Sequence, residues 1–231
     1  MNHSPTTIPE TAANAKPRLV VVWDLPTRLF HWLLVAFVIT SFVTVEIGGN
    51  AMRIHEWSGF TILALLFFRV GWGFLGSRTA RFTTFVRGPK AVWIYARTLR
   101  GKESPLYFGH NPLGGWSILA MLTALFVQAG SGLFANDEIM TEGPLYGWVS
   151  KATSNIITHV HEWNQGLLVT LVAVHVLAIV FYFVVKRENL LAPMITGRRT
   201  WQATIEAQAG RAWAAVAIAA AAAGAVYLLV R

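Results

Sequence analysis

Long apolar runs separated by polar segments dominate the chain and predict a bundle of membrane-spanning helices. Four runs cover about residues 27–47, 54–75, 110–134 and 161–185. Each is long enough to cross the hydrocarbon core of a bilayer, which takes about 20 helical residues. A fifth run, residues 212–230, is just long enough, although alanine, its main residue, is only weakly hydrophobic. We therefore predict an all-α integral membrane protein, a four-helix transmembrane bundle with a fifth, alanine-rich transmembrane helix.

Composition supports a membrane protein and limits the cofactors that it can hold. The 231 residues are 55% hydrophobic and only 13% charged, with a positive mean hydropathy. Soluble domains are typically about one quarter charged. The chain has no cysteine, which excludes disulfides, thiolate-ligated clusters and covalent haem attachment through a Cys-x-x-Cys-His motif. Any haem must therefore be held noncovalently, by ligands to its iron and by packing.

The formal charge of +8 is distributed very unevenly along the chain. Fifteen basic residues fall on one side of the predicted spans: Lys16, Arg18, Arg28, Arg78, Arg81, Arg87, Lys90, Arg97, Arg100, Lys102, Lys186, Arg187, Arg198, Arg199 and Arg211. Three fall on the other side, namely Arg53, Lys151 and Arg231. Because basic residues collect in cytoplasmic loops, we expect a cytoplasmic N-terminus and, with five spans, an outer C-terminus. This distribution favours contact with membrane lipid and argues against nucleic acid as a partner.

Three regions follow from the positions of the spans. We expect a cytoplasmic N-terminal tail at residues 1–24, a transmembrane domain at 25–190, and a polar linker with the last helix at 191–231. Asp24 can cap the first helix and Pro26 suits its first turn.

Two further segments have a readable pattern. Residues 19–23 form an apolar run that is too short to span a membrane. Residues 89–100 mix apolar and basic positions and predict a helix that lies on the membrane surface.

Four histidines fall into two pairs at matching depths. His161 and His175 lie fourteen residues apart, close to four helical turns and roughly 21 Å, so their side chains share one face of the fourth span. With the orientation above, His55 at the start of the second span has the depth of His161, and His31 has the depth of His175. Two imidazoles at each of two depths are what bis-histidine ligation of two b haems requires. The ordinary alternative is that each histidine is an interfacial or satisfied core residue.

Two other histidines fit the pairs less well. His159 is sixteen residues from His175, which turns it about 160° away from the shared face, so we reject it as a ligand. His110 lies too shallow, at the start of the third span. It is either a surface histidine or a proton-handling group near a quinone.

Glycine and arginine residues near the histidines fit the same hypothesis. Gly59 lies one turn after His55, where a missing side chain would let a porphyrin approach the backbone, and Gly130, Gly132 and Gly166 could serve likewise. Arg69 lies within a span, fourteen residues after His55, and needs an anionic partner such as a haem propionate. Arg28 could also meet a propionate. The alternatives are close helix packing for the glycines, and snorkelling or lipid phosphate for the arginines.

The motifs together resemble the bacterial cytochrome b561 family, most closely the b-type cytochrome subunit of nickel–iron hydrogenases. They are Val22-Trp-Asp-Leu-Pro-Thr-Arg-Leu-Phe-His31-Trp, then His55-x3-Gly59 with Arg69, then Gly109-His-Asn-Pro-Leu-Gly114, and the His161/His175 spacing. The resemblance covers about residues 20–190. It implies a four-helix bundle with two noncovalent b haems ligated at His31, His55, His161 and His175. It also implies electron exchange between the quinone pool and a redox partner outside. The fifth helix departs from the usual four-span pattern.

Three functions are compatible with these features. The first is an electron-carrying subunit of a respiratory complex in the bacterial inner membrane, serving a periplasmic cytochrome c or hydrogenase-like partner. The second is a free-standing quinone-linked oxidoreductase, such as a superoxide oxidase. The third is a transporter or metal channel that uses intramembrane histidines. The loop with Asp137, Glu138 and Glu142 either docks a basic partner or is simply a soluble loop.

Overall fold

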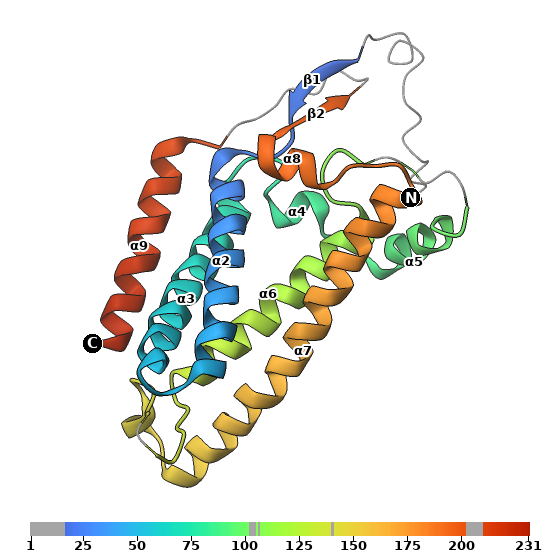
Figure 1. Ribbon diagram of the computed structural model, residues 1–231. Helices are drawn as coiled ribbons and strands as arrows, with labels where there is room; N and C mark the ends of the chain where they lie inside the picture. Colours follow the sequence, from blue (N-terminus) through green and yellow to red (C-terminus); the bar gives the residue numbers. More distant parts are fainter. Residues whose placement is uncertain (1–16, 102–104, 106, 140, 202–209) are drawn as a thin grey trace.

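Five helices in the described part of the chain are long and apolar enough to cross a membrane (Figure 1). The computed structural model describes residues 17–101, 105, 107–139, 141–201 and 210–231. The five helices are α2 (Leu25–Ile47), α3 (Met52–Leu75), α6 (Pro112–Gly132), α7 (Lys151–Val184) and α9 (Ala212–Val230). All five predicted spans are therefore helices. Most of the predicted N-terminal tail, Lys102 and part of the predicted linker lie outside the described residues.

Side-chain caps fix where three of these helices begin. The Asp24 carboxylate accepts a hydrogen bond from the Thr27 amide at 2.9 Å, with Pro26 in the first turn, as predicted. Asn111 caps α6 in the same way, through the Gly114 amide. The Ser150 hydroxyl caps α7. Helix α7 begins ten residues before the predicted start of the fourth span at His161, so the span is continued by a more polar segment of the same helix.

Helix α3 is the centre of the bundle. It packs against α2, α6 and α9, while α7 packs on α6, and in Figure 1 α9 and α7 lie on opposite flanks. Leu66 and Trp72 of α3 are completely buried. The Trp72 indole donates a hydrogen bond to Asp24 Oδ2 at 3.1 Å, which joins the end of α3 to the start of α2.

A two-stranded antiparallel sheet lies at the end of the bundle where α2 begins (Figure 1). It pairs β1 (Arg18–Val21) with β2 (Arg198–Trp201), and β2 follows the short helix α8 (Leu191–Thr196). Gly197 turns the chain between α8 and β2 with φ +80°, and a Cβ there would lie 2.8 Å from the Trp23 carbonyl oxygen. The short apolar run at residues 19–23 is thus mainly a strand, which the all-α prediction did not include.

Short helices cover the same end. They are α4 (Phe82–Phe85) and α5 (Pro89–Thr98). Two short 3-10 helices, η1 (Gly49–Ala51) and η2 (Tyr146–Trp148), lie elsewhere in the chain. The predicted helix at 89–100 is α5: Trp93 is exposed and Tyr95 is buried. The Tyr95 hydroxyl hydrogen-bonds to the Tyr182 hydroxyl of α7 at 2.6 Å. Burial and this hydrogen bond raise the pKa of Tyr95, so the phenol stays protonated.

Helix α7 exposes large apolar side chains over most of its length, including Leu167, Val174, Leu177 and Val180. In a membrane these side chains meet lipid, while a helix satisfies its own backbone hydrogen bonds.

Candidate functional site

His55 of α3 and His161 of α7 lie together, and we call them the outer histidine pair. Their ring centroids are 6.3 Å apart and the ring planes are nearly perpendicular, at 77°. The two rings come from helices more than 100 residues apart in sequence.

The Nδ1 atom of His55 is held by Ser41 of α2. It lies 2.9 Å from the Ser41 carbonyl oxygen and 3.1 Å from the Ser41 hydroxyl oxygen. A carbonyl oxygen can only accept a hydrogen bond, so Nδ1 carries the proton and donates it. In the neutral imidazole, Nε2 of His55 is then the nitrogen with a free lone pair, which can bind a metal.

The Nδ1 atom of His161 has the same environment, supplied by α6. It lies 2.9 Å from the Gln128 carbonyl oxygen and 3.1 Å from the Ser131 hydroxyl oxygen. The same reasoning leaves Nε2 of His161 free to bind a metal. Asn164, one turn further along α7, donates to the Gln128 side chain at 2.7 Å and so ties α7 to the same point of α6.

The separation of the outer histidine pair fits one metal ion between the rings. With metal–nitrogen bonds of about 2 Å and about 1 Å from nitrogen to ring centre, two such imidazoles have centroids about 6 Å apart. No cluster of three or more His, Cys, Asp or Glu occurs among the described residues. An ion held by two imidazoles needs its other ligands from elsewhere, as the nitrogens of a porphyrin would provide.

His31 of α2 and His175 of α7 form what we call the inner histidine pair. They lie close enough for their charges to interact. The Nδ1 atom of His31 is buried and has no hydrogen-bond partner in the described part of the chain. Within the described residues, His31 therefore lacks the hydrogen bonds that hold His55 and His161.

Arg69 is a buried cation that forms no ion pair within the described part of the chain, and the carboxylate whose charge acts on it is that of Asp24. Its side chain is only 4% exposed. Nη2 donates to the Ala80 carbonyl oxygen at 3.1 Å, the guanidinium lies 4.7 Å from the Phe82 ring centroid, and Nη1 is buried with no partner among the described residues. A buried charge needs compensation. A carboxylate at Nη1, such as the propionate predicted from sequence, would supply it.

His110 is partly buried, and its ring packs between two aromatic side chains. Its ring lies between Trp23 and Phe85, with centroid distances of 4.5 and 4.7 Å, and Nδ1 is buried without a partner in the described residues. Burial, and then the nearby Arg69 and His175, lower the pKa of His110 to about 3. The imidazole is therefore neutral near pH 7, and the interpretation as a surface histidine is wrong.

The glycines of the predicted site differ in their surroundings. A Cβ at Gly132 would lie 3.0 Å from Cε1 of His161, so this glycine makes room for the ring. A Cβ at Gly59, Gly130 or Gly166 would meet nothing within 4 Å. Gly59 therefore leaves open space beside His55, where a planar cofactor could lie.

Arg28, a candidate from the sequence, and His159, which was rejected, each have their own contacts. Arg28 donates through Nη1 to the Ile195 carbonyl oxygen at 2.7 Å, joining α2 to α8, and its Nε is buried without a partner among described residues. His159 points outward with its side chain 73% exposed and contacts Glu162.

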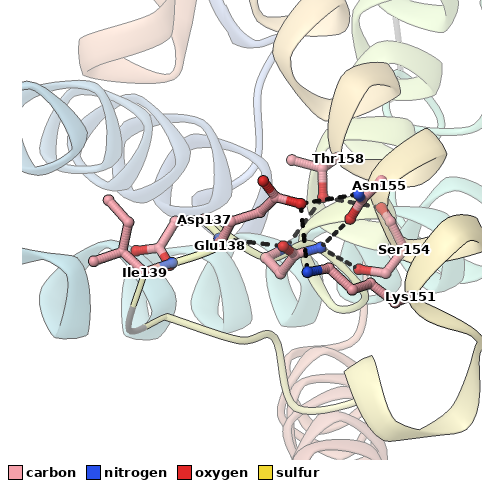
Figure 2. Close-up of polar contacts among 8 residues, drawn as sticks. Asp137, Glu138, Ile139, Lys151, Ser154, Asn155 and Thr158 are labelled. Carbon is pink, nitrogen blue, oxygen red and sulfur yellow. Dashed lines mark hydrogen bonds and ion pairs between the residues drawn. The ribbon is translucent and has the colours of Figure 1, made fainter.

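The loop between α6 and α7 is fastened to the start of α7 by polar contacts (Figure 2). The Asn136 amide group donates to Ser154 and Asn155, at 2.6 and 3.0 Å. Glu138 lies 3.8 Å from Lys151 and accepts a hydrogen bond from Asn155. One of the three acids expected to dock a basic partner therefore already has a cation beside it.

Sequence reasoning missed Ser41, Gln128 and Ser131. Polar side chains within apolar runs are uncommon in membranes and are often functional, so their presence in α2 and α6 was a usable signal. The contacts of these residues with His55 and His161 depend on how α2 and α6 are rotated about their own axes. The position of an apolar run in the sequence does not define that rotation.

Comparison with known proteins shows the family of the chain. The sequence model of the prokaryotic cytochrome b561 family matches residues 22–197. A probable Ni/Fe-hydrogenase B-type cytochrome subunit from Bradyrhizobium diazoefficiens is 25% identical over 215 residues, covering 79% of this chain and 87% of the relative. The protein of the same description from Azotobacter vinelandii is 27% identical over 219 residues, covering 81% and 91%. No solved structure matches the chain significantly.

The family match covers helices α2, α3, α6 and α7 with both histidine pairs, and it ends before α9. The chain belongs to the prokaryotic cytochrome b561 family and is a multi-pass membrane b-type cytochrome of electron transfer.

Proposed function

We propose that this protein binds two b haems, one between His55 and His161 and one between His31 and His175. In this proposal it carries electrons between a redox partner outside the bacterial inner membrane and the quinone pool. The N-terminus is cytoplasmic, in keeping with the fifteen basic residues on that side.

The observation that carries the proposal is the outer histidine pair. Its 6.3 Å centroid separation would suit two imidazoles that hold one iron, and both rings keep Nε2 available because carbonyl oxygens accept the Nδ1 protons. The inner histidine pair lies about four turns further along α7, roughly 21 Å away. Its two members interact electrostatically.

When bound, haem iron would supply one-electron redox chemistry. The chain would contribute two imidazole ligands at each depth, and such ligation would favour electron transfer over oxygen binding. Arg69 contributes a buried positive charge for a propionate. Gly59 and Gly132 keep side chains away from the two outer imidazoles.

The partner is proposed from the relatives. Two of them are described as subunits of Ni/Fe-hydrogenases, so we infer that a hydrogenase subunit exchanges electrons with this protein on the outer side. The quinone would be the second electron partner, on the cytoplasmic side.

Haem stoichiometry in the purified protein tests the proposal. We expect two haems per chain by pyridine haemochrome assay and a b-type reduced-minus-oxidised spectrum. Reconstituted in liposomes, the protein should be reduced by an added quinol. His159→Ala, at an exposed position, is the matched control and should retain both haems. One haem per chain, or none, under haem-sufficient expression would refute the two-haem proposal.

A further inference from the structure

The two histidines of the outer pair are braced in the same way by two different helices. Ser41 of α2 holds His55 of the following helix α3, and Ser131 of α6 holds His161 of the following helix α7. In each case a serine hydroxyl at 3.1 Å and a carbonyl oxygen at 2.9 Å share one Nδ1 atom.

Both hydroxyl groups must act as acceptors at Nδ1. The carbonyl contacts fix the proton on Nδ1, so a hydroxyl oxygen at the same nitrogen can only accept. At Ser131 the hydroxyl proton is already committed, because it donates to the Val127 carbonyl oxygen at 2.6 Å. Each Nδ1–H is therefore shared between two acceptors, which restrict rotation of the imidazole ring.

The inner pair offers the contrast. Among the described residues, the buried Nδ1 atom of His31 has no hydrogen-bond partner. The bracing is thus a property of one pair and not of both.

We propose that Ser41 and Ser131 are positioning residues that set the ring orientation and the basicity of the outer pair. This inference rests on the proposed function. Hydrogen bonds from Nδ1–H make an imidazole a stronger donor to a metal, which stabilises ferric over ferrous iron and lowers the reduction potential. Ligand hydrogen bonding is one of the ways in which a protein tunes a haem. The outer site therefore has the lower potential, and its ligand planes are held near 77°.

Nearly perpendicular imidazole planes have a recognisable spectroscopic consequence. In low-spin ferric haem, perpendicular axial planes give a strongly anisotropic EPR signal, whereas parallel planes give a rhombic one. Loss of one serine hydroxyl leaves the carbonyl oxygen as the remaining acceptor at Nδ1 and so weakens the restraint on the ring. The anisotropic signal should therefore broaden or move toward the rhombic type.

The test uses the full-length protein with Ser41→Ala, Ser131→Ala and the double variant. We expect the lower of the two midpoint potentials to rise and the anisotropic EPR signal to change, with the other haem unaffected. Ser41→Thr, which retains a hydroxyl, should restore the wild-type values. The matched control is Ser58→Ala, because the buried Ser58 hydroxyl donates only to the Ile54 carbonyl oxygen of its own helix.

The outcomes separate this inference from the proposed function. Wild-type protein with two haems, and a double variant with unchanged midpoints and EPR signals, would overturn the inference alone. Loss of only the outer haem in an alanine variant supports it, whereas loss of both haems indicates a general folding role and overturns it. A wild-type protein without two haems would overturn both.

Discussion

Gly132 of α6 lies so close to His161 of α7 that a Cβ on this glycine would be 3.0 Å from Cε1 and 3.4 Å from Nδ1 of the imidazole. The same imidazole is hydrogen-bonded through Nδ1 to the carbonyl oxygen of Gln128, one turn earlier on α6, and to the hydroxyl of Ser131, the residue next to Gly132. The ring can move away from position 132 only by lengthening these hydrogen bonds. Packing against Gly132 and hydrogen bonds to α6 therefore hold the His161 ring in place from one neighbouring helix.

Gly132→Ala should disturb the outer site specifically. Overpacking of this kind costs about 1–3 kcal/mol, and the displaced ring is expected to bind its haem more weakly. We expect selective loss or spectral change of one haem, measured by haem stoichiometry and EPR. Gly130→Ala is the control, since a Cβ there meets nothing within 4 Å. Equal effects of the two substitutions would argue against a specific role for the Gly132 contact.

The inner pair makes a separate prediction. His31→Ala or His175→Ala should each remove one haem and leave the other, because the two pairs share no ligand and lie roughly 21 Å apart along α7. Redox titration should then show a single component, with the same midpoint in both variants. Retention of two haems in either variant would refute the pairing of His31 with His175.

Arg69 should tune the inner haem. A buried positive charge stabilises the reduced, less positive form of a nearby haem, so Arg69→Gln should lower the midpoint potential of that haem. A fall of about 60 mV corresponds to a tenfold change in the one-electron equilibrium. The control is Arg78→Gln, because Arg78 is exposed at the same end of the bundle and its charge is screened by solvent. An unchanged midpoint in Arg69→Gln would contradict a propionate partner for this arginine.

The sequence was informative where one physical effect dominates. Apolar runs longer than a bilayer core predicted all five helices, and Asp24 with Pro26 predicted the start of α2. Prediction from the sequence failed where contacts with other segments of the chain determine the local structure. The strand at residues 18–21 exists because it pairs with residues 198–201, and the early start of α7 depends on Ser150 and on contacts with the 136–138 loop. The bracing by Ser41 and Ser131 depends on the rotation of α2 and α6, which an apolar run leaves undefined.

The role of α9 can be tested at its contact with α3. A Cβ on Gly71 would lie 2.7 Å from Cγ2 of Ile218, so the two helices approach closely at this glycine. Between helices in lipid, such packing replaces the hydrophobic effect as a source of association.

Gly71→Leu should therefore detach α9 and lower the thermal denaturation temperature. Both haems should remain, since the two histidine pairs belong to α2, α3 and α7 and the family match ends at residue 197. Gly224→Leu is the matched control on α9, because a Cβ there has open space. Loss of haem in Gly71→Leu, with Gly224→Leu unaffected, would instead make α9 part of the haem-binding structure.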